Sequence, residues 1–263
     1  MKTKIPHLTI ALCLYAAQPA AAALIFQMDF NDADGNQSLL DRGTTGVTGS
    51  FTGGSTYSTT VAPVNSGGYS GSFDGSSGAA DFGDIDALDG LTTMTITAWI
   101  KMDSAGQNGG GRIVNKRASN NFDLYYHSTD SELEFVANTV PVANGGGSIG
   151  FGDWTFIAIT YDGTDATFYT GDGTTLSAGD VDPTANGSLG SNSLSLLIGN
   201  HSGGARTFDG LIDNVRIYDS IESAASLESI MQFNDASFVP EPSSSALLGL
   251  GGLALILRRK RSR

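Results

Sequence analysis

Two glutamates separated by one residue, Glu132 and Glu134, are the side chains of this chain that look most like an acid–base pair. They fall in the run ELEFVA, where Leu133 and Phe135 face one way and the glutamates the other, because side chains alternate along a strand. A rise of about 3.3 Å per residue places the two carboxylates roughly 7 Å apart. Paired carboxylates at such a separation cleave glycosidic bonds, so the pair predicts chemistry on a glycan.

Three other side chains are candidates for contact with a saccharide. Trp99 lies in the run MTITAWIK, on the face opposite Ile96 and Ile100, where it either packs or offers a stacking platform. His201 and Arg206 lie in the loop NHSGGART and could contact a glycan hydroxyl or carboxylate, with a solvated loop as the alternative. The three histidines never cluster with cysteine, so the sequence predicts no zinc site.

The clearest element that could position these residues is a hairpin over residues 153–173. Its first half, WTFIAITY, alternates two sets of side chains that are both apolar, which predicts a strand covered on both faces. The sequence DGTD at 162–165 favours a turn, and 166–170 resumes a β-prone run. We therefore expect this hairpin inside a layered β structure.

Other short alternating runs predict further strands, and residues 221–231 show helical spacing. The stretches 31–71 and 171–193 are polar connections. The predicted strands are Leu24–Phe30, a strand that Phe73 opens and Ala79–Phe82 continue, Thr92–Lys101, Ile113–Lys116, Phe122–His127, Glu132–Ala137, Leu194–Gly199 and Asn214–Tyr218.

Five segments in order resemble the laminin G-like domains of the concanavalin A-like superfamily. They are SFDG at 72–75, MTITAWIK at 94–101, IVNK at 113–116, the hairpin, and FDGLIDNVRIY at 208–218. The resemblance implies an all-β fold, a two-sheet antiparallel jelly-roll β-sandwich over residues 24–238, in which the first strand pairs with the last. It does not imply one ligand, because the superfamily includes lectins, adhesion modules and glycanases.

The resemblance also bears on metal binding and catalysis. Many laminin G-like domains hold Ca²⁺ near one rim, which points to Asp41, Asp74 and Asp213, with turn capping as the alternative. Glycanases of the laminarinase type carry Glu-x-Asp-x-x-Glu, whereas residues 132–137 read Glu-Leu-Glu-Phe-Val-Ala. The middle acid is changed and the last is missing, so we expect a protein that is not an enzyme.

Charge is strongly negative between the two ends of the chain. Residues 24–238 hold 7 basic and 26 acidic residues, a net charge of −19. Phosphate binding needs basic surface, so nucleic acid is not a predicted partner. Divalent cations and neutral polymers fit this charge better.

The N-terminus has the pattern of a secretory signal peptide over residues 1–23. Lys2 and Lys4 precede an apolar run, and small residues follow up to Ala23. A membrane anchor would need a longer apolar span. The single cysteine, Cys13, lies in the apolar run, so cleavage would leave a protein without disulfides.

The C-terminus, residues 239–263, resembles the PEP-CTERM sorting signal of Gram-negative bacteria. Pro240, Glu241 and Pro242 are followed by the apolar segment 246–257 and a basic tail. The resemblance implies anchoring in the inner membrane and cutting by an exosortase, which passes the protein to the cell surface or extracellular matrix. A permanent anchor is the alternative.

Together these features predict an exported, non-catalytic surface or matrix module that binds polysaccharide. A glycan-cleaving enzyme using Glu132 and Glu134, and a purely structural coat protein, are the alternatives. The sequence does not name the sugar.

Overall fold

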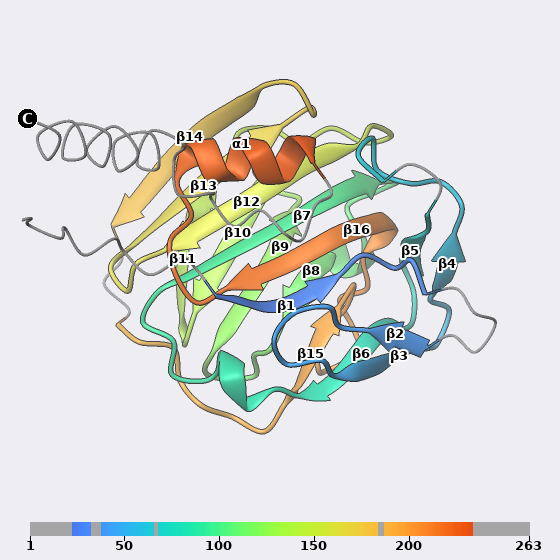
Figure 1. The fold of residues 1–263 in the computed structure, drawn as a ribbon, viewed down its shortest axis with the longest axis horizontal. Coiled ribbons are helices and arrows are strands. Elements are labelled where there is room, and N and C mark those ends of the chain that lie inside the picture. The colour runs from blue at the N-terminus through green and yellow to red at the C-terminus, as the bar shows by residue number, and fades with distance from the viewer. Residues whose placement is uncertain (1–22, 33–37, 66–67, 184–186, 234–263) are drawn as a thin grey trace, which may run out of the picture.

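In a computed structural model, which describes residues 23–32, 38–65, 68–183 and 187–233, the chain forms a sandwich of two antiparallel β-sheets (Figure 1). This confirms the predicted all-β jelly-roll architecture. Most of the predicted signal peptide and all of the predicted sorting segment lie outside the described residues. Within the described part, no helix is long and apolar enough to cross a membrane.

The first sheet, sheet A, contains the predicted central hairpin. Seven of its strands form one path, and β1 (Leu24–Met28) pairs with the long strand β16 beside that path. In order across the sheet, the path is β14 (Leu176–Pro183), β13 (Asp165–Gly171), β12 (Thr155–Tyr161), β7 (Met94–Met102), β16 (Asp209–Tyr218), β5 (Ser70–Asp74) and β4 (Thr56–Ser58).

The second sheet, sheet B, has eight strands and contains the meander predicted over residues 113–137. In order across the sheet, they are β11 (Val140–Gly145), β10 (Glu132–Ala137), β9 (Phe122–His127), β8 (Arg112–Asn115), β15 (Ser195–Ile198), β6 (Ala79–Asp84), β3 (Thr48–Thr52) and β2 (Ser38–Leu40). Two 3₁₀ turns, η1 (Asp86–Leu88) and η2 (Gln107–Gly109), connect strands.

The main core fills the space between the two sheets. Strand β12 sends Ile157 and Ile159 into it, and β10 sends Leu133 and Phe135 from the opposite sheet. Full burial of one such side chain stabilises the fold by about 1.5–3 kcal/mol, so the alternation of apolar residues fixes which face of each strand turns inward.

A second, smaller core lies on the outer face of sheet A. The helix α1 (Ala224–Gln232) lies across β12 and β13 in Figure 1, and it packs Leu227, Ile230 and Met231 against Phe156 and Ala158 of β12. Both faces of β12 are therefore covered, as the sequence predicted. The helix begins at the cap Ser223, whose hydroxyl accepts a hydrogen bond from the backbone N–H of residue 226 at 3.1 Å.

Two predictions about strand layout were wrong. Residues 73 and 79–82 do not continue one strand, because β5 belongs to sheet A and β6 to sheet B. The turn between them carries Gly75 and Gly78 at φ of 68° and 96°, a backbone conformation that favours glycine and reverses the chain. The polar connections 31–71 and 171–193 also contain strands, which are β2, β3, β4 and β14.

Candidate functional site

The outer face of sheet B carries polar side chains on three neighbouring strands. Arg112 of β8 and Glu134 of β10 both lie opposite Tyr125 of β9 in the strand register, and Asp123 precedes Tyr125 by two residues on the same face. The residues that alternate with them are buried in the main core. We name Arg112, Asp123, Tyr125, Glu134 and, from the loop after β15, His201 and Arg206 the outer-face cluster.

Arg112 holds the cluster together through three contacts. Its Nε donates to Asp123 Oδ2 at 2.9 Å, and its Nη1 donates to the carbonyl oxygen of Gly110 at 2.8 Å. Its Cζ lies 3.7 Å from the centroid of the Tyr125 ring, which is a cation–π contact. The Asp123 carboxylate is fully buried. Since breaking a buried ion pair costs about 3–5 kcal/mol, this contact fixes the position of both groups.

Glu134 is tied to Tyr125. Burial raises the pKa of Tyr125 well above its ordinary value, and the hydrogen bond with Glu134 and the negative charge of Glu134 act in the same direction. The phenol therefore stays protonated and donates to the carboxylate. The Nε2 of His127 lies 4.0 Å from Glu134 Oε2, and its Nδ1 lies 2.8 Å from the carboxylate of Asp130. Glu132 is half-buried opposite His127. Glu132 and Glu134 therefore share a strand face, as predicted, but Glu134 already has a partner.

The loop after β15 brings His201 and Arg206 to the cluster. The guanidinium groups of Arg206 and Arg112 are neighbours beside Gly110. If Gly110 had a Cβ atom, the Nη1 atom of each arginine would lie 3.0 Å from it. Burial, and then the positive charges of Arg112, Arg206 and Arg117, lower the pKa of His201, so its imidazole is neutral at pH 7. Two of the three predicted saccharide contacts thus meet the predicted glutamate at one face.

Two buried polar atoms of this face have no hydrogen-bond partner within the part of the chain that the structure describes. They are Oδ1 of Asp123 and Nδ2 of Asn115, and the two residues are register partners on β9 and β8. An unsatisfied buried group costs about 1–3 kcal/mol, and because both residues are 0% exposed, an ordered water is the partner that suits them. One acceptor and one donor therefore remain to be satisfied beside the ion pair.

Sequence reasoning missed Arg112, Asp123 and Tyr125. A usable signal was the run FDLYYH at 122–127, in which Asp123, Tyr125 and His127 alternate with apolar residues. That pattern places polar groups on one face of a strand inside a buried meander. The sequence alone does not show that the loop carrying His201 covers the same face.

The third predicted saccharide contact, Trp99, lies in the second core. It is 1% exposed and packs edge-on against Phe156, with ring centroids 5.7 Å apart. The turn after β13 covers the Trp99 ring. Gly173 of this turn, at φ of 94°, lies so close that an added Cβ atom would be 3.3 Å from the ring. The sequence correctly placed Trp99 on the face away from the main core, but in this structure the ring is closed to a sugar.

The three aspartates predicted to hold calcium lie in separate surroundings, each accepting backbone N–H groups. Asp41 Oδ1 accepts from Gln27 N and Gly43 N, both at 2.7 Å. Asp74 Oδ1 accepts from the N–H groups of residues 76 and 77 at 2.9 and 2.8 Å. The structure therefore does not bring these carboxylates together into one ligand set, and calcium binding stays a prediction.

Asp213 is the most perturbed of the three. Its side chain is fully buried in sheet A and accepts hydrogen bonds from Ala62 N at 3.0 Å and from Asn65 Nδ2 at 3.0 and 3.2 Å. Burial raises its pKa to about 7, although these hydrogen bonds act in the opposite direction. The carboxyl group is thus about half protonated at neutral pH.

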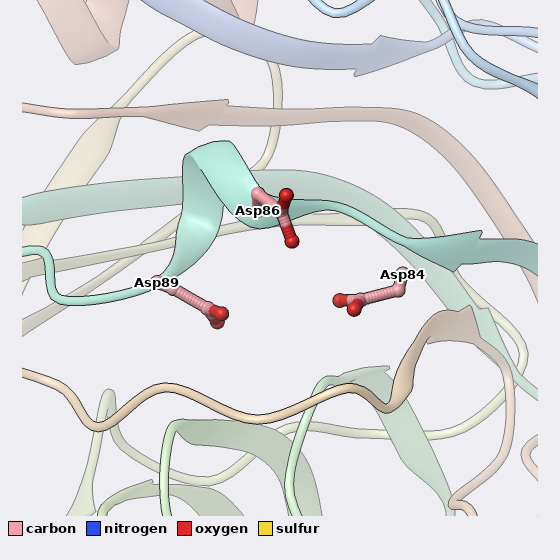
Figure 2. A group of neighbouring side chains, drawn as sticks. All are labelled: Asp84, Asp86 and Asp89. Atoms are coloured by element: carbon pink, nitrogen blue, oxygen red, sulfur yellow. The ribbon is translucent and has the colours of Figure 1, made fainter.

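A different group of three acids comes together beside η1. The carboxylates of Asp84, Asp86 and Asp89 point toward one another in Figure 2, with oxygens within 4.8 Å, and no other such group occurs in the described ranges. The buried ammonium of Lys116 donates to Asp84 at 2.8 Å, to Asp89 at 3.0 Å and to the carbonyl oxygen of Asn192 at 3.1 Å. All three N–H groups of that ammonium are used, so a cation belonging to the chain already compensates part of the negative charge of this group.

Comparison with family models shows the family to which this chain belongs. The model of the concanavalin A-like lectin/glucanases superfamily, of the laminin G type, matches residues 74–228. The chain therefore belongs to this superfamily. A second model, the PEP-CTERM protein-sorting motif, matches residues 238–261. That motif marks an exosortase-targeted protein destined for the cell surface or extracellular space of a Gram-negative bacterium.

Solved structures with the same fold include binding domains and enzymes. Domain 4 of AbnA, an extracellular arabinanase from Geobacillus stearothermophilus solved with arabinotriose, has a TM-score of 0.61 and 18% identity, covering 80% of this chain and 99% of that domain. The binding domain of Paraclostridial Mosquitocidal Protein 1 has a TM-score of 0.55 and 13% identity, with 80% and 52% covered. Trypanosoma rangeli sialidase with the inhibitor DANA has a TM-score of 0.53 and 13% identity, with 81% and 33% covered.

At these identities the similarity shows the fold alone. The chain spans about half of the mosquitocidal binding domain and a third of the sialidase. No curated protein matches the sequence.

Proposed function

We propose that this chain is a non-catalytic surface or matrix module that binds polysaccharide through the outer-face cluster. The observation that carries the proposal is the convergence of His201, Arg206 and Arg112 on the outer face of sheet B, beside the Tyr125 ring. A sugar hydroxyl accepts as well as donates hydrogen bonds, so it can accept from the N–H groups gathered there.

The surrounding groups suit the same ligand. Nδ1 of His201 accepts the backbone N–H of Gly203 at 2.9 Å, so its Nε2–H is left as a donor, like the guanidinium groups of Arg112 and Arg206. The Tyr125 ring holds the Arg112 guanidinium in place. Of the seven basic residues between positions 24 and 238, three arginines act electrostatically on His201, so the outer-face cluster is a local exception to the acidic surface.

The comparisons support a glycan ligand and export to the cell surface. The domain of AbnA was solved with arabinotriose, and the sorting motif directs its carrier to the cell surface or extracellular space, where polysaccharides are found. The exosortase is then a transient partner, and polysaccharide or another matrix component the lasting one.

The engagement of Glu134 favours binding over cleavage. A glycosidase needs one carboxyl group to protonate the leaving oxygen and a second to attack or to activate water. Here Glu134 accepts the hydrogen bond of Tyr125, and the remaining carboxylate of that strand face, Glu132, lies across from His127. The enzyme alternative is tested by the same experiment as binding.

The test uses the full-length chain, purified in detergent, on a panel of immobilised polysaccharides with measurement of retention and of released reducing ends. We expect retention without reducing ends, and a drop of at least tenfold in affinity for a His201→Ala/Arg206→Ala double variant. Lys101→Ala, which removes one charge from β7 in the other sheet, is the matched control and should bind like the wild type.

The outcomes separate the three functions. Reducing ends that disappear in Glu134→Gln would establish an enzyme and overturn the proposal. Neither retention nor cleavage on any glycan would leave the structural coat role. Retention that the double variant does not weaken would remove the outer-face cluster as the binding site.

A further inference from the structure

A cleft of about 550 Å³ lies at the other side of the sandwich, between the loop 148–155 and the turn after β13. This volume falls within the range of about 300–1,000 Å³ that ligand sites occupy. The cleft belongs to sheet A, because β12 and β13 supply its walls, and it contains none of the residues of the outer-face cluster.

Trp154 gives the cleft an aromatic wall. The chain has two tryptophans, and whereas Trp99 is buried, Trp154 is half-buried: part of its ring packs against the second core and the rest lines the cleft. The apolar face of a pyranose ring stacks on an indole, and a ring already held by the core loses little conformational freedom when a ligand binds. Trp154, 55 residues after Trp99, thus offers the stacking platform that the sequence suggested at Trp99.

The polar wall of the cleft is acidic. Asp172 accepts hydrogen bonds through Oδ1 from the N–H groups of Thr174 and Thr175 and from the Thr174 hydroxyl, all at 2.7–2.8 Å, and these bonds lower its pKa to about 2. Its other oxygen has no hydrogen bond among the described residues. Asp153 is also exposed in the cleft, and no lysine or arginine lines it. The carboxylates repel an anionic ligand and accept from hydroxyl groups.

From these features we propose that the Trp154 cleft is a second saccharide site, selective for neutral sugar units. The pyranose face stacks on Trp154, and the carboxylates of Asp153 and Asp172 accept hydrogen bonds from its hydroxyls. The proposal extends the glycan-binding function and rests on it for the ligand class, but it uses different residues from another sheet. With two sites, one module can hold two segments of polymer.

The test measures tryptophan emission of the full-length chain on titration with a panel of neutral glycans and with polygalacturonate. A Trp99→Phe variant leaves Trp154 as the single emitter, and we expect its emission to change with a neutral glycan and not with polygalacturonate. Asp153→Ala, in which the exposed side chain that is lost makes no hydrogen bond within the described residues, should weaken that response at least tenfold. Asp180→Ala removes a comparable exposed carboxylate from β14 and should not.

The proposals for the Trp154 cleft and for the outer-face cluster can be refuted independently of each other. A neutral-glycan response that survives Asp153→Ala, or no response from any neutral glycan while the outer-face cluster still retains polysaccharide, would overturn the Trp154 cleft and leave the proposed function intact. An equal response to polygalacturonate would overturn the selectivity. Weaker retention in His201→Ala/Arg206→Ala with an unchanged Trp154 response would assign the two ligands to two sites, as proposed.

Discussion

Replacing Lys116 by methionine removes the ammonium between Asp84 and Asp89 while keeping the length of the buried stem. The Lys116 side chain is 0% exposed, and the two carboxylates are 33% and 16% exposed. Breaking a buried pair costs about 3–5 kcal/mol, but the partial exposure of Asp84 lets water stabilise its charge, so we expect about 3 kcal/mol. Asp89 keeps its hydrogen bond from Asn121 at 2.7 Å.

Thermal and urea unfolding would measure this loss. For a domain of this size, 3 kcal/mol lowers the melting temperature by about 6–12 °C. Lys101→Met is the matched control, because it removes a half-exposed ammonium for which no ion pair is found in the described ranges, and it should change stability by less than about 0.5 kcal/mol. Equal stability of the two variants would refute the view that the ion pairs of Lys116 stabilise the fold.

The Lys116→Met variant also tests whether the three aspartates can bind a metal ion. Without the ammonium, Asp84, Asp86 and Asp89 offer oxygens within 4.8 Å, which suits Ca²⁺. We therefore expect millimolar Ca²⁺ to raise the melting temperature of Lys116→Met by more than that of the wild type, because a ligand of the folded state stabilises it. A rise of the same size in both proteins would show that this group does not gain a cation.

Three further predictions concern pH, calcium and processing. The pKa of Asp213 is raised to about 7, so its contribution to stability is complete below about pH 4 and falls by as much as about 4 kcal/mol as the pH rises to neutrality; urea unfolding of Asp213→Asn should lack this loss, and an identical pH profile would contradict it. If Asp41, Asp74 or Asp213 binds calcium, adding Ca²⁺ to wild-type protein pretreated with a chelator should raise its melting temperature, and an unchanged melting temperature would contradict calcium binding. Exosortase cutting predicts an intact mass, for protein from its native host, that lacks residues 258–263, and a mature form that retains them would exclude it.

The sequence predicted those parts of the fold in which period-two alternation is strong. The hairpin β12–β13, the meander β8–β10 and the pairing of β1 with β16 are confirmed. Of the missed strands, β2 and β4 are three residues long, β3 is mostly exposed, and β14 is a sheet-edge strand whose described side chains are mostly exposed. Such strands are held by backbone hydrogen bonds to their neighbours, so their side chains carry little pattern.

The candidate sites were predicted less completely, because each is assembled from distant segments. His201 and Arg206 were identified as a loop, yet their neighbour Arg112 lies about 90 residues earlier. Asp84, Asp86 and Asp89 are close together in the sequence, whereas the partner Lys116 follows another strand. Trp154 was predicted as a core residue of the hairpin, and only the loop 148–153 shows that part of its ring is left in a cleft.

The pairing of β1 with β16 has a consequence for the timing of export. Leu24 lies opposite Tyr218, so the first strand of the domain finds its partner only after nearly two hundred further residues have been made available. Contacts of such sequence separation form late and slow the folding of a β-sandwich. The sorting motif begins at residue 238, about 20 residues beyond β16. Sheet A can thus be completed only after residue 218 is available, which leaves about 20 residues between the end of the last strand and the sorting motif.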